Sequence, residues 1–356
     1  MQAKISDVDK PFLYLTCSLI AIGLIFVASA SWSESYHYTD SAWTFIMKQG
    51  IYALLGIPVM FLVSFSHFRW WKKFAWLFAI ISLILLVINA KYGVVIGGAR
   101  RWLNLGFINL QVSEFAKIAI VLLLTKCFID RKRVLPALLI SFIMLGLVLK
   151  QPDLGSSILI SSGIFFVAFA SNVPLWLLGM IVVLGGTGAW FHITHTPYQM
   201  LRIKYWLDPY SDPLGYGYNL IQSQYAIGSG QVWGLGLGAS LQKQGALPIS
   251  HADFIFSIIC EEMGFLGATA FLLVICLWIL RALQICYMIP DNFARIMGIS
   301  LIGLISTQMF INIGVATGLL PITGMTLPFI SYGGSSLISS CIIAGILLNI
   351  SRFREW

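Results

Sequence analysis

Long apolar segments separated by short polar ones run the length of the 356-residue chain. An α-helix needs about 20 apolar residues to cross the hydrocarbon core of a bilayer. Apolar windows predict helices near residues 12–31, 45–65, 74–90, 113–129, 134–149, 155–171, 173–191, 253–280, 294–317 and 330–350. We therefore predict an all-α polytopic membrane protein with ten transmembrane helices, forming a single domain over residues 1–356.

The composition supports this fold class. Hydrophobic residues make up 58% of the chain and charged residues only 10%, against roughly 25% charged residues in an ordinary soluble domain. The net charge of +8 comes from Lys and Arg spread over short segments between the apolar runs. This distribution favours membrane orientation over nucleic-acid binding, so no nucleic-acid partner is expected.

The basic residues also predict which way the helices run. With ten helices both termini lie on one side, and the loops of that side hold thirteen of the 22 Lys and Arg residues. By the positive-inside rule, both termini are expected to be cytoplasmic. The longest connection, about 192–252 between the seventh and eighth helices, is then extracytoplasmic. Nine basic residues remain on or near the outer side, where positive charge is normally sparse, so we expect an anionic ligand there.

The long outer connection is rich in aromatic residues. They are Tyr198, Tyr205, Trp206, Tyr210, Tyr216, Tyr218, Tyr225 and Trp233. Amphipathic rings suit the headgroup layer of a membrane, and such rings also stack on the faces of sugars. For any single ring, the interfacial belt is the simpler interpretation.

Three polar residues stand out in the segment 97–117, "GGARRWLNLGFINLQVSEFAK". Glu114 and Lys117 are three residues apart, so they share one face of a helix and can pair. The pair could simply neutralise two charges at a membrane boundary. Alternatively, Arg101 and Lys117 could cradle a phosphate, for which guanidinium and ammonium groups are suited.

Two further segments have a backbone that departs from a regular helix. In "KQPDLGSS", 150–157, capping of the following helix is the default role for Asp153. Lys150 and Asp153 could equally face the same outer cavity as Arg101. The segment 314–336 contains two prolines and several glycines, and it can form a shaped re-entrant loop only where protein or a water-filled cavity lines it.

The stretch 251–267, "HADFIFSIICEEMGFLG", carries three carboxylates into an apolar region. If it is one straight helix, Glu261 and Glu262 lie about 12 to 14 Å deeper than Asp253. We interpret the two glutamates as structural residues or as part of a cavity wall, and Asp253 as facing the outer mouth. An aspartate at a wet mouth beside Arg and Lys is expected to have a low pKa, to be ionised and to accept a proton.

Taken together, the ordered strings "GARRWLNLGF" with "SEFAK", "QPDLG", "HADFIF" with "EEMGFLG", and "GMTLPFISYGGSS" resemble the SEDS family (shape, elongation, division and sporulation). The resemblance covers nearly the whole chain. It implies a peptidoglycan glycosyltransferase of the plasma (inner) membrane that polymerises lipid II. The last string is more similar to the branch that acts at the division septum than to the cell-elongation branch.

The same resemblance implies roles for individual residues. The essential aspartate of the family corresponds to Asp253, and Arg101, Glu114 and Lys117 correspond to polar cavity residues, as do Lys150 and Asp153. The expected mechanism uses Asp253 as general base on the 4-hydroxyl of the acceptor sugar, while Arg101 and Lys117 stabilise the departing lipid pyrophosphate. The product would be a β-1,4 glycan formed with inversion.

Partners, cofactors and alternative functions follow from the same resemblance. The expected partners are lipid II, a class B penicillin-binding protein as transpeptidase, and other divisome proteins. No dedicated carboxylate cluster is evident, so no metal ligand is assigned, although Mg²⁺ or Mn²⁺ could share the phosphate charge. The alternatives are the same polymerase acting in elongation, a lipid II flippase with Glu261 and Glu262 lining its path, and a scaffold that recruits other wall enzymes.

Overall fold

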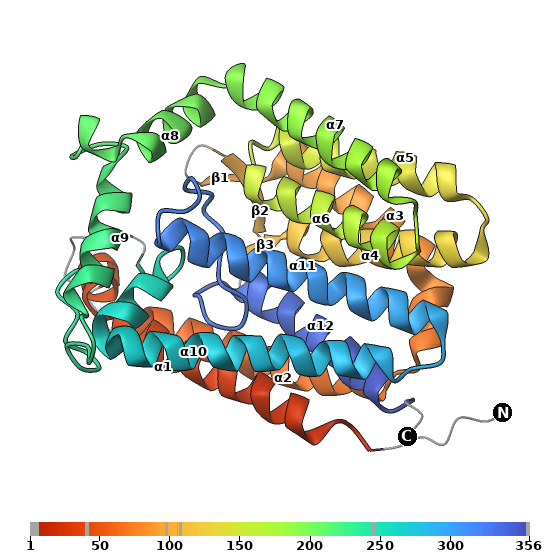
Figure 1. The fold of residues 1–356 in the computed structure, drawn as a ribbon, viewed down its shortest axis with the longest axis horizontal. Coiled ribbons are helices and arrows are strands. Elements are labelled where there is room, and N and C mark those ends of the chain that lie inside the picture. Colours follow the sequence, from red (N-terminus) through yellow and green to blue (C-terminus); the bar gives the residue numbers. More distant parts are fainter. Residues whose placement is uncertain are drawn as a thin grey trace.

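The computed structural model describes residues 7–39, 43–96, 99–104, 106, 109–243, 247–248 and 250–353. Ten long helices form the bundle seen in Figure 1. They are α1 (Lys10–Thr39), α2 (Thr44–Phe65), α3 (Phe68–Tyr92), α4 (Val112–Asp130), α5 (Val134–Lys150), α6 (Leu154–Ala170), α7 (Leu175–Thr194), α10 (Ile255–Tyr287), α11 (Asn292–Ala316) and α12 (Gly334–Ser351). Each corresponds to one predicted apolar segment.

The predicted class of all-α polytopic membrane protein is confirmed. Within the described ranges, six helices are long and apolar enough to cross a membrane, namely α1, α2, α3, α10, α11 and α12. Helices α5, α6 and α7 are shorter apolar helices. The count of ten spans stays a prediction.

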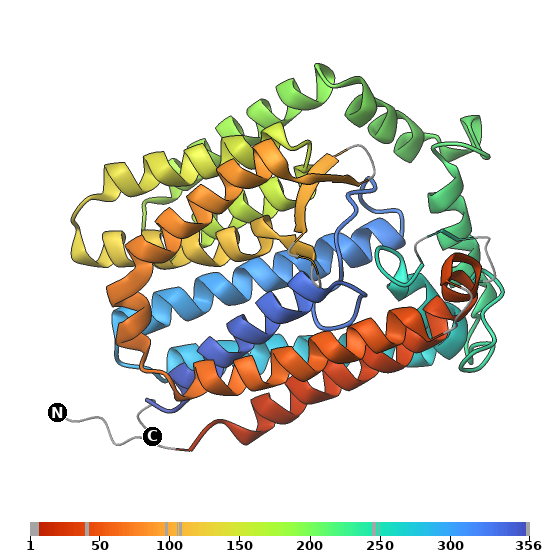
Figure 2. The same ribbon diagram turned by 180° about the vertical axis from the view of Figure 1, so that it is seen from behind.

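Both ends of the described chain lie at the same end of the bundle. The backbone N–H of Asp9 donates to the hydroxyl of Ser351 at 3.0 Å, and the guanidinium of Arg281 pairs with the Asp9 carboxylate at 2.7 Å. We call this the terminal end. Helices α8 (Pro197–Leu207) and α9 (Tyr218–Ser229) lie at the opposite end, which we call the loop end (Figures 1 and 2).

The core is built around one helix that neighbouring helices enclose. Helix α12 is buried along almost its whole length between α2, α4, α10 and α11. Close packing of α12 on α2 depends on small residues, because a Cβ at Gly345 would come within 2.6 Å of the Met60 carbonyl oxygen. In lipid, the hydrophobic effect does not favour contact between helices. Van der Waals contacts at such a close approach are therefore a main contribution to helix association.

The connections contain regular elements that the apolar pattern did not predict. Strands β1 (Val94–Ile96), β2 (Ala99–Asn104) and β3 (Asn109–Gln111) form an antiparallel sheet in the order β1-β2-β3. The predicted outer connection 192–252 contains α8, the 3-10 helix η1 (Pro209–Ser211) and α9. Strands β1 and β3 have three residues each and are too short to show a period of two, and the six residues of β2 do not alternate between apolar and polar, which explains why the strands were missed.

Helix α10 reverses direction within its first third. Gly264 has φ 65° and ψ −170°, which is not helical. The ring of Phe256 lies 6.2 Å from the ring of Phe271, whereas fifteen residues of straight helix would separate them by roughly 22 Å. The segment 255–263 therefore folds back on the remainder of α10. The prediction of one straight helix over 253–280 is wrong.

The backbone groups freed at this reversal are satisfied by the segment that follows α9. The N–H groups of Phe265 and Leu266 donate to the carbonyls of Gln231 and Val232 at 2.8 and 3.2 Å. In return, the N–H groups at positions 235 and 236 donate to the carbonyls of Glu261 and Glu262, each at 3.0 Å. A helix can break in a membrane protein only where other protein groups complete its hydrogen bonds, and this segment does so.

We expect Gly264→Ala to destabilise the protein by about 1 to 3 kcal/mol, because an L-residue is strained at this φ. The added Cβ would also lie 2.3 Å from the backbone nitrogen of Gly234. The matched control is Gly146→Ala in α5, where nothing lies within 4 Å of the added Cβ. Thermal unfolding of the purified variants in detergent measures both. Equal midpoints for the two variants would contradict the structural role of Gly264.

Candidate functional site

The carboxylate of Asp253 lies in a turn that immediately precedes α10. Its side chain is half-buried. The backbone carbonyl of Asp253 accepts a hydrogen bond from the Asn312 side chain at 3.0 Å, which ties the turn to the last turns of α11. A Cβ at Gly324 would lie 3.6 Å from Oδ2 of Asp253. The loop that contains Gly324 therefore passes directly beside the carboxylate.

That loop, residues 317–333, is held in place from two sides. On the α11 side, Asn312 donates to the Met325 carbonyl at 2.6 Å and Gln308 donates to the Thr326 carbonyl at 3.0 Å. On the other side, the Ser331 hydroxyl donates to the Ala252 carbonyl at 2.5 Å. Protein groups therefore line the loop. A non-helical segment at membrane depth requires such a lining.

The electrostatic surroundings of Asp253 contain opposing effects. Burial raises the pKa of the Asp253 carboxyl, while Arg202, His251 and Arg101 act to lower it, and burial dominates. The expectation of a low pKa at a wet mouth is therefore wrong. The physical reason is that the reversal of α10 places residue 253 against α11 and the 317–333 loop, where the charged form loses hydration.

Arg101 projects from β2 and is anchored to the turn between α5 and α6. One guanidinium nitrogen donates to the Pro152 carbonyl at 2.6 Å, and Nε lies 3.8 Å from the Asp153 carboxylate. Asp153 also caps α6, since its carboxylate accepts from the backbone N–H and the hydroxyl of Ser156 at 3.1 and 2.8 Å. The capping role of Asp153 is confirmed, and the same carboxylate faces Arg101, while the place of Asp153 on an outer cavity stays a prediction.

The predicted pairing of Glu114 with Lys117 is confirmed at 2.7 Å. Both side chains are buried, with exposed fractions of 6% and 2%. The Ser339 hydroxyl donates to Glu114 at 2.6 Å, and the Lys117 ammonium donates to Gln308 at 2.7 Å. Because Gln308 also holds the 317–333 loop, the buried pair is linked to the segment beside Asp253. This geometry favours a positioning role for Lys117, and direct contact with a phosphate stays a prediction.

The two glutamates of α10 hold the segment that follows α9. Glu261 accepts from the Ser240 hydroxyl and, at 2.9 Å, from the backbone N–H of Leu241. Glu262 pairs with Lys243 at 2.8 Å. The glutamates therefore lie at the reversal of α10. The expectation that they lie deeper along a straight helix is wrong.

Lys150 is the last residue of α5 and its side chain is exposed. Among the described residues, it has no ion pair with the group formed by Arg101, Asp153 and Asp253. The structure thus brings Arg101 and Asp153 together and leaves Lys150 apart from them. A role for Lys150 in substrate binding stays a prediction.

The sequence analysis missed three residues that shape this site. Gln308 and Asn312 are four apart on one face of the apolar helix α11. Their spacing was a usable signal, because polar side chains inside a membrane helix are usually paired or functional. Arg202 counted only as one of several outer cations, yet its guanidinium donates to the Ile322 carbonyl at 3.0 Å, two residues from Gly324.

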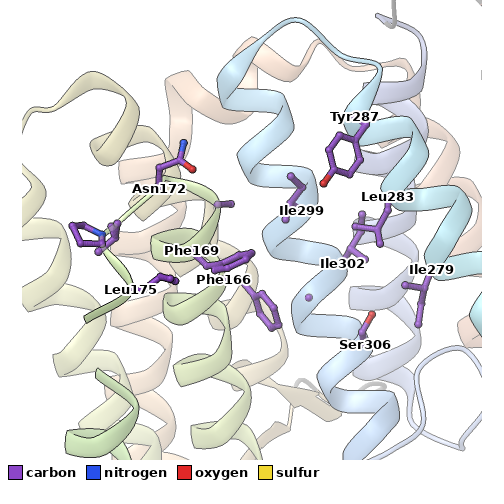
Figure 3. Close-up of a pocket in the computed structure, with 14 residues that line it drawn as sticks. Phe166, Phe169, Asn172, Leu175, Ile279, Leu283, Tyr287, Ile299, Ile302 and Ser306 are labelled. Carbon is purple, nitrogen blue, oxygen red and sulfur yellow. The ribbon is translucent and has the colours of Figure 1, made fainter. Parts of the chain in front are cut away.

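A separate apolar pocket of about 680 Å³ lies between α6, the start of α7, α10 and α11 (Figure 3). It includes Tyr287 near the end of α10, so it lies toward the terminal end, away from Asp253. Its lining contains no charged residue. The pocket therefore offers no acid, base or cation for chemistry.

No group of three or more His, Cys, Asp or Glu residues within the described ranges is arranged to hold a metal ion. A divalent cation that accompanies a phosphate substrate stays a prediction from the sequence.

Comparison with known proteins adds independent information. Residues 10–356 match the family of cell cycle proteins that comprises FtsW, RodA and SpoVE. The chain is 37% identical to stage V sporulation protein E of Bacillus subtilis, with all of both chains covered. It is 36% identical to a probable peptidoglycan glycosyltransferase FtsW of Geobacter metallireducens, over 98% of this chain and 96% of that protein.

Solved structures give the same result. A chain from a structure of a peptidoglycan synthase complex matches with a TM-score of 0.79 and 31% identity, covering 98% of both chains. A mutant of the rod shape determining protein RodA of Thermus thermophilus matches with a TM-score of 0.74 and 28% identity, over 98% of this chain and 99% of that one. The prediction from the sequence motifs is therefore confirmed: the chain belongs to the FtsW, RodA and SpoVE family of cell cycle proteins.

Proposed function

We propose that the chain is a peptidoglycan glycosyltransferase that polymerises lipid II into β-1,4 glycan strands. The observation that carries the proposal is the half-buried Asp253 carboxylate, held beside Gly324 with Arg101 and Arg202 in its surroundings. A base and cations are what glycosyl transfer from a diphosphate requires. The names of the relatives, probable peptidoglycan glycosyltransferases, support the same reaction.

In the proposed reaction, Asp253 takes the proton from the 4-hydroxyl of the acceptor sugar. The oxygen attacks the anomeric carbon of the donor, and the bond between that carbon and the diphosphate oxygen breaks with inversion. The bonding electrons leave with undecaprenyl pyrophosphate, and the proton stays on Asp253 until solvent removes it. A base is most effective when its pKa lies closer to the working pH, and the raised pKa of Asp253 acts in that direction.

The departing diphosphate needs positive charge on the same side of the protein. The Arg101 guanidinium has other N–H groups besides the one that donates to the Pro152 carbonyl. The Arg101 side chain is 21% exposed. We assign the diphosphate contact to Arg101. Lys117 is nearly inaccessible, so in this proposal it positions the 317–333 loop through Gln308.

The proposal includes a location and partners. The protein resides in the plasma (inner) membrane with both termini cytoplasmic and Asp253 on the extracytoplasmic side, where lipid II presents its sugars. A class B penicillin-binding protein crosslinks the product, and other divisome proteins recruit the pair to the septum. The structural relative described as coordinating polymerization and crosslinking in a peptidoglycan synthase complex supports such a partnership.

Purified protein in liposomes tests the proposal. External lipid II should be converted to glycan polymer, with and without a co-purified class B penicillin-binding protein. Transbilayer movement of labelled lipid II is measured in the same vesicles. Polymer supports the enzyme, whereas lipid movement without polymer supports a flippase. Absence of polymer both alone and with the transpeptidase would overturn the proposal.

The contacts of Glu261 and Glu262 favour the enzyme over the flippase. A translocation path needs polar side chains that face the passing headgroup. Both glutamates instead bind Ser240, Leu241 and Lys243 at the reversal of α10. Their contacts are those of residues that fasten a loop to a helix.

The polymerisation rate should fall as the pH is lowered through the raised pKa of Asp253. The base must be deprotonated, so the acidic limb of the pH profile should lie above the ordinary aspartate value of about 3.9. Arg202→Gln removes the largest effect that lowers this pKa and should move the limb to higher pH. The measurement is kcat/KM for lipid II against pH. A limb unmoved by Arg202→Gln would show that another group titrates.

A further inference from the structure

A second pocket, of about 360 Å³, opens at the loop end between α8, the turn that precedes α9, the start of α9 and the 317–333 loop. Aromatic and polar side chains line it together, and we call it the aromatic pocket. Its main lining residues are Tyr198, Arg202, Tyr205, Trp206, Asp212 and Tyr216. A pocket of this size accommodates a small polar ligand or one to two sugar rings.

The rings of the aromatic pocket are held in fixed orientations. Tyr205 and Tyr216 stack with centroids 5.3 Å apart and an interplanar angle of 4°. The indole N–H of Trp206 donates to the Gly318 carbonyl at 2.9 Å. The Tyr216 backbone N–H donates to the Asp212 carboxylate at 3.0 Å. Because these contacts set the rings before any ligand arrives, a ligand that stacks on them loses little ordering free energy.

The charges in this pocket disfavour an anionic or a purely apolar ligand. Arg202 and Asp212 contribute one positive and one negative charge to the lining. A phosphate would meet the Asp212 carboxylate, and a prenyl chain would exclude water from both charged groups without offering either one a hydrogen bond. A pyranose ring has an apolar face that packs on an aromatic ring and a rim of hydroxyls that bonds charged and amide groups. A neutral saccharide matches this lining.

The aromatic pocket is connected to Asp253 through one side chain. Arg202 lines the pocket and donates to the carbonyl of Ile322, which also lines it. Ile322 is two residues from Gly324, whose Cβ position lies 3.6 Å from the Asp253 carboxylate. A glycan that extends from the reacting sugar could therefore continue along the 317–333 loop into the pocket.

We propose that the aromatic pocket is a saccharide subsite that holds a sugar unit of the glycan strand during polymerisation. This inference rests on the proposed function for its biological role, but binding of a saccharide can be measured without turnover. Stacking on Tyr216 and Tyr205 keeps the strand bound between additions. Contacts to the apolar face of a sugar do not depend on strand length, which suits a polymer that grows by repeated steps.

The test is titration calorimetry of the purified full chain with a tetrasaccharide of alternating N-acetylglucosamine and N-acetylmuramic acid that carries neither lipid nor peptide and whose lactyl carboxyls are amides, so that the probe is neutral. Tyr216→Ala should raise Kd at least about tenfold, equivalent to about 1.4 kcal/mol. Tyr216→Phe keeps the ring and should stay within about threefold, or about 0.7 kcal/mol. Tyr92→Ala is the matched control, because Tyr92 is an exposed tyrosine outside the pocket.

A second readout is the length distribution of polymer made from lipid II. Tyr216→Ala should shorten the strands, and Tyr216→Phe should not. The proposal is overturned if the wild-type protein does not bind the tetrasaccharide, if Tyr216→Ala leaves Kd unchanged, or if the free pentapeptide binds equally well and with the same dependence on Tyr216. Since the tetrasaccharide has no diphosphate, loss of its binding leaves the polymerase proposal standing. Absence of polymer from the wild-type protein would overturn the polymerase proposal, and polymer made by Asp253→Asn protein at the wild-type rate would overturn the role of Asp253 as base.

Discussion

Asp253→Asn is expected to reduce polymerisation of lipid II by about 100- to 10,000-fold, the range that a general base contributes. Asparagine preserves the size of the side chain and the backbone contact to Asn312, so the loss would come from the missing base. The matched control is Asp208→Asn, the same change at an exposed aspartate of the loop end, which should leave the rate unchanged. Polymer formation from labelled lipid II measures both.

The same substitution should raise the thermal midpoint of the protein at neutral pH. Folding raises the pKa of Asp253. At pH values between the pKa of Asp253 in the unfolded state and its higher pKa in the folded state, the folded protein therefore binds more protons than the unfolded protein. Stability contributed by the protonated form is therefore lost as the pH rises through that interval. Asparagine is never charged, so it avoids this cost. A variant that loses activity but unfolds at a lower temperature than wild type would indicate misfolding, and would contradict the assignment.

Lys117→Met is expected to destabilise the protein by about 3 to 5 kcal/mol, because it leaves the buried Glu114 carboxylate without its cation. The double variant with Glu114→Gln should recover most of that loss, since no charge then remains buried. Unfolding of the purified protein in detergent gives both values. Recovery in the double variant separates an uncompensated charge from a simple loss of packing.

The control for this prediction is an ion pair of the same length in a different environment. Lys72 and Asp130 also lie 2.7 Å apart, but their exposed fractions are 33% and 35%. Lys72→Met should cost less than about 1 kcal/mol, because water screens an exposed pair. If Lys72→Met and Lys117→Met cost the same, burial of the Glu114–Lys117 pair would not be the cause.

Apolar periodicity predicted the long helices well because lipid imposes a single rule. A chain that crosses a bilayer must satisfy its own backbone, so a run of about 20 apolar residues has few alternatives to a helix. Nearest-neighbour spacing was equally reliable for Glu114 and Lys117, since residues three apart on a helix always meet on one face. Both inferences concern contacts between residues close together in the sequence.

The prediction for the environment of Asp253 was wrong, and its role as the catalytic base stays a prediction. The sequence analysis treated residues 253–280 as one straight helix, because the glycine at 264 could equally sit inside a helix. A break at Gly264 is stable because the freed N–H groups donate to the backbone carbonyls of Gln231 and Val232. These carbonyls belong to a segment about 30 residues earlier in the chain. No local pattern reports such a pairing.

The sequence by itself determined the membrane class, the positions of the ten apolar segments and the family of this protein, because hydrophobicity, helical spacing and ordered motifs are properties of the chain alone. Only the tertiary structure decided that α10 folds back at Gly264, that Gln308 and Asn312 hold the 317–333 loop beside Asp253, and that Arg202 links this carboxylate to the aromatic pocket. These features depend on hydrogen bonds and burial between segments distant in the sequence, and their free energies exist only once the helices have packed.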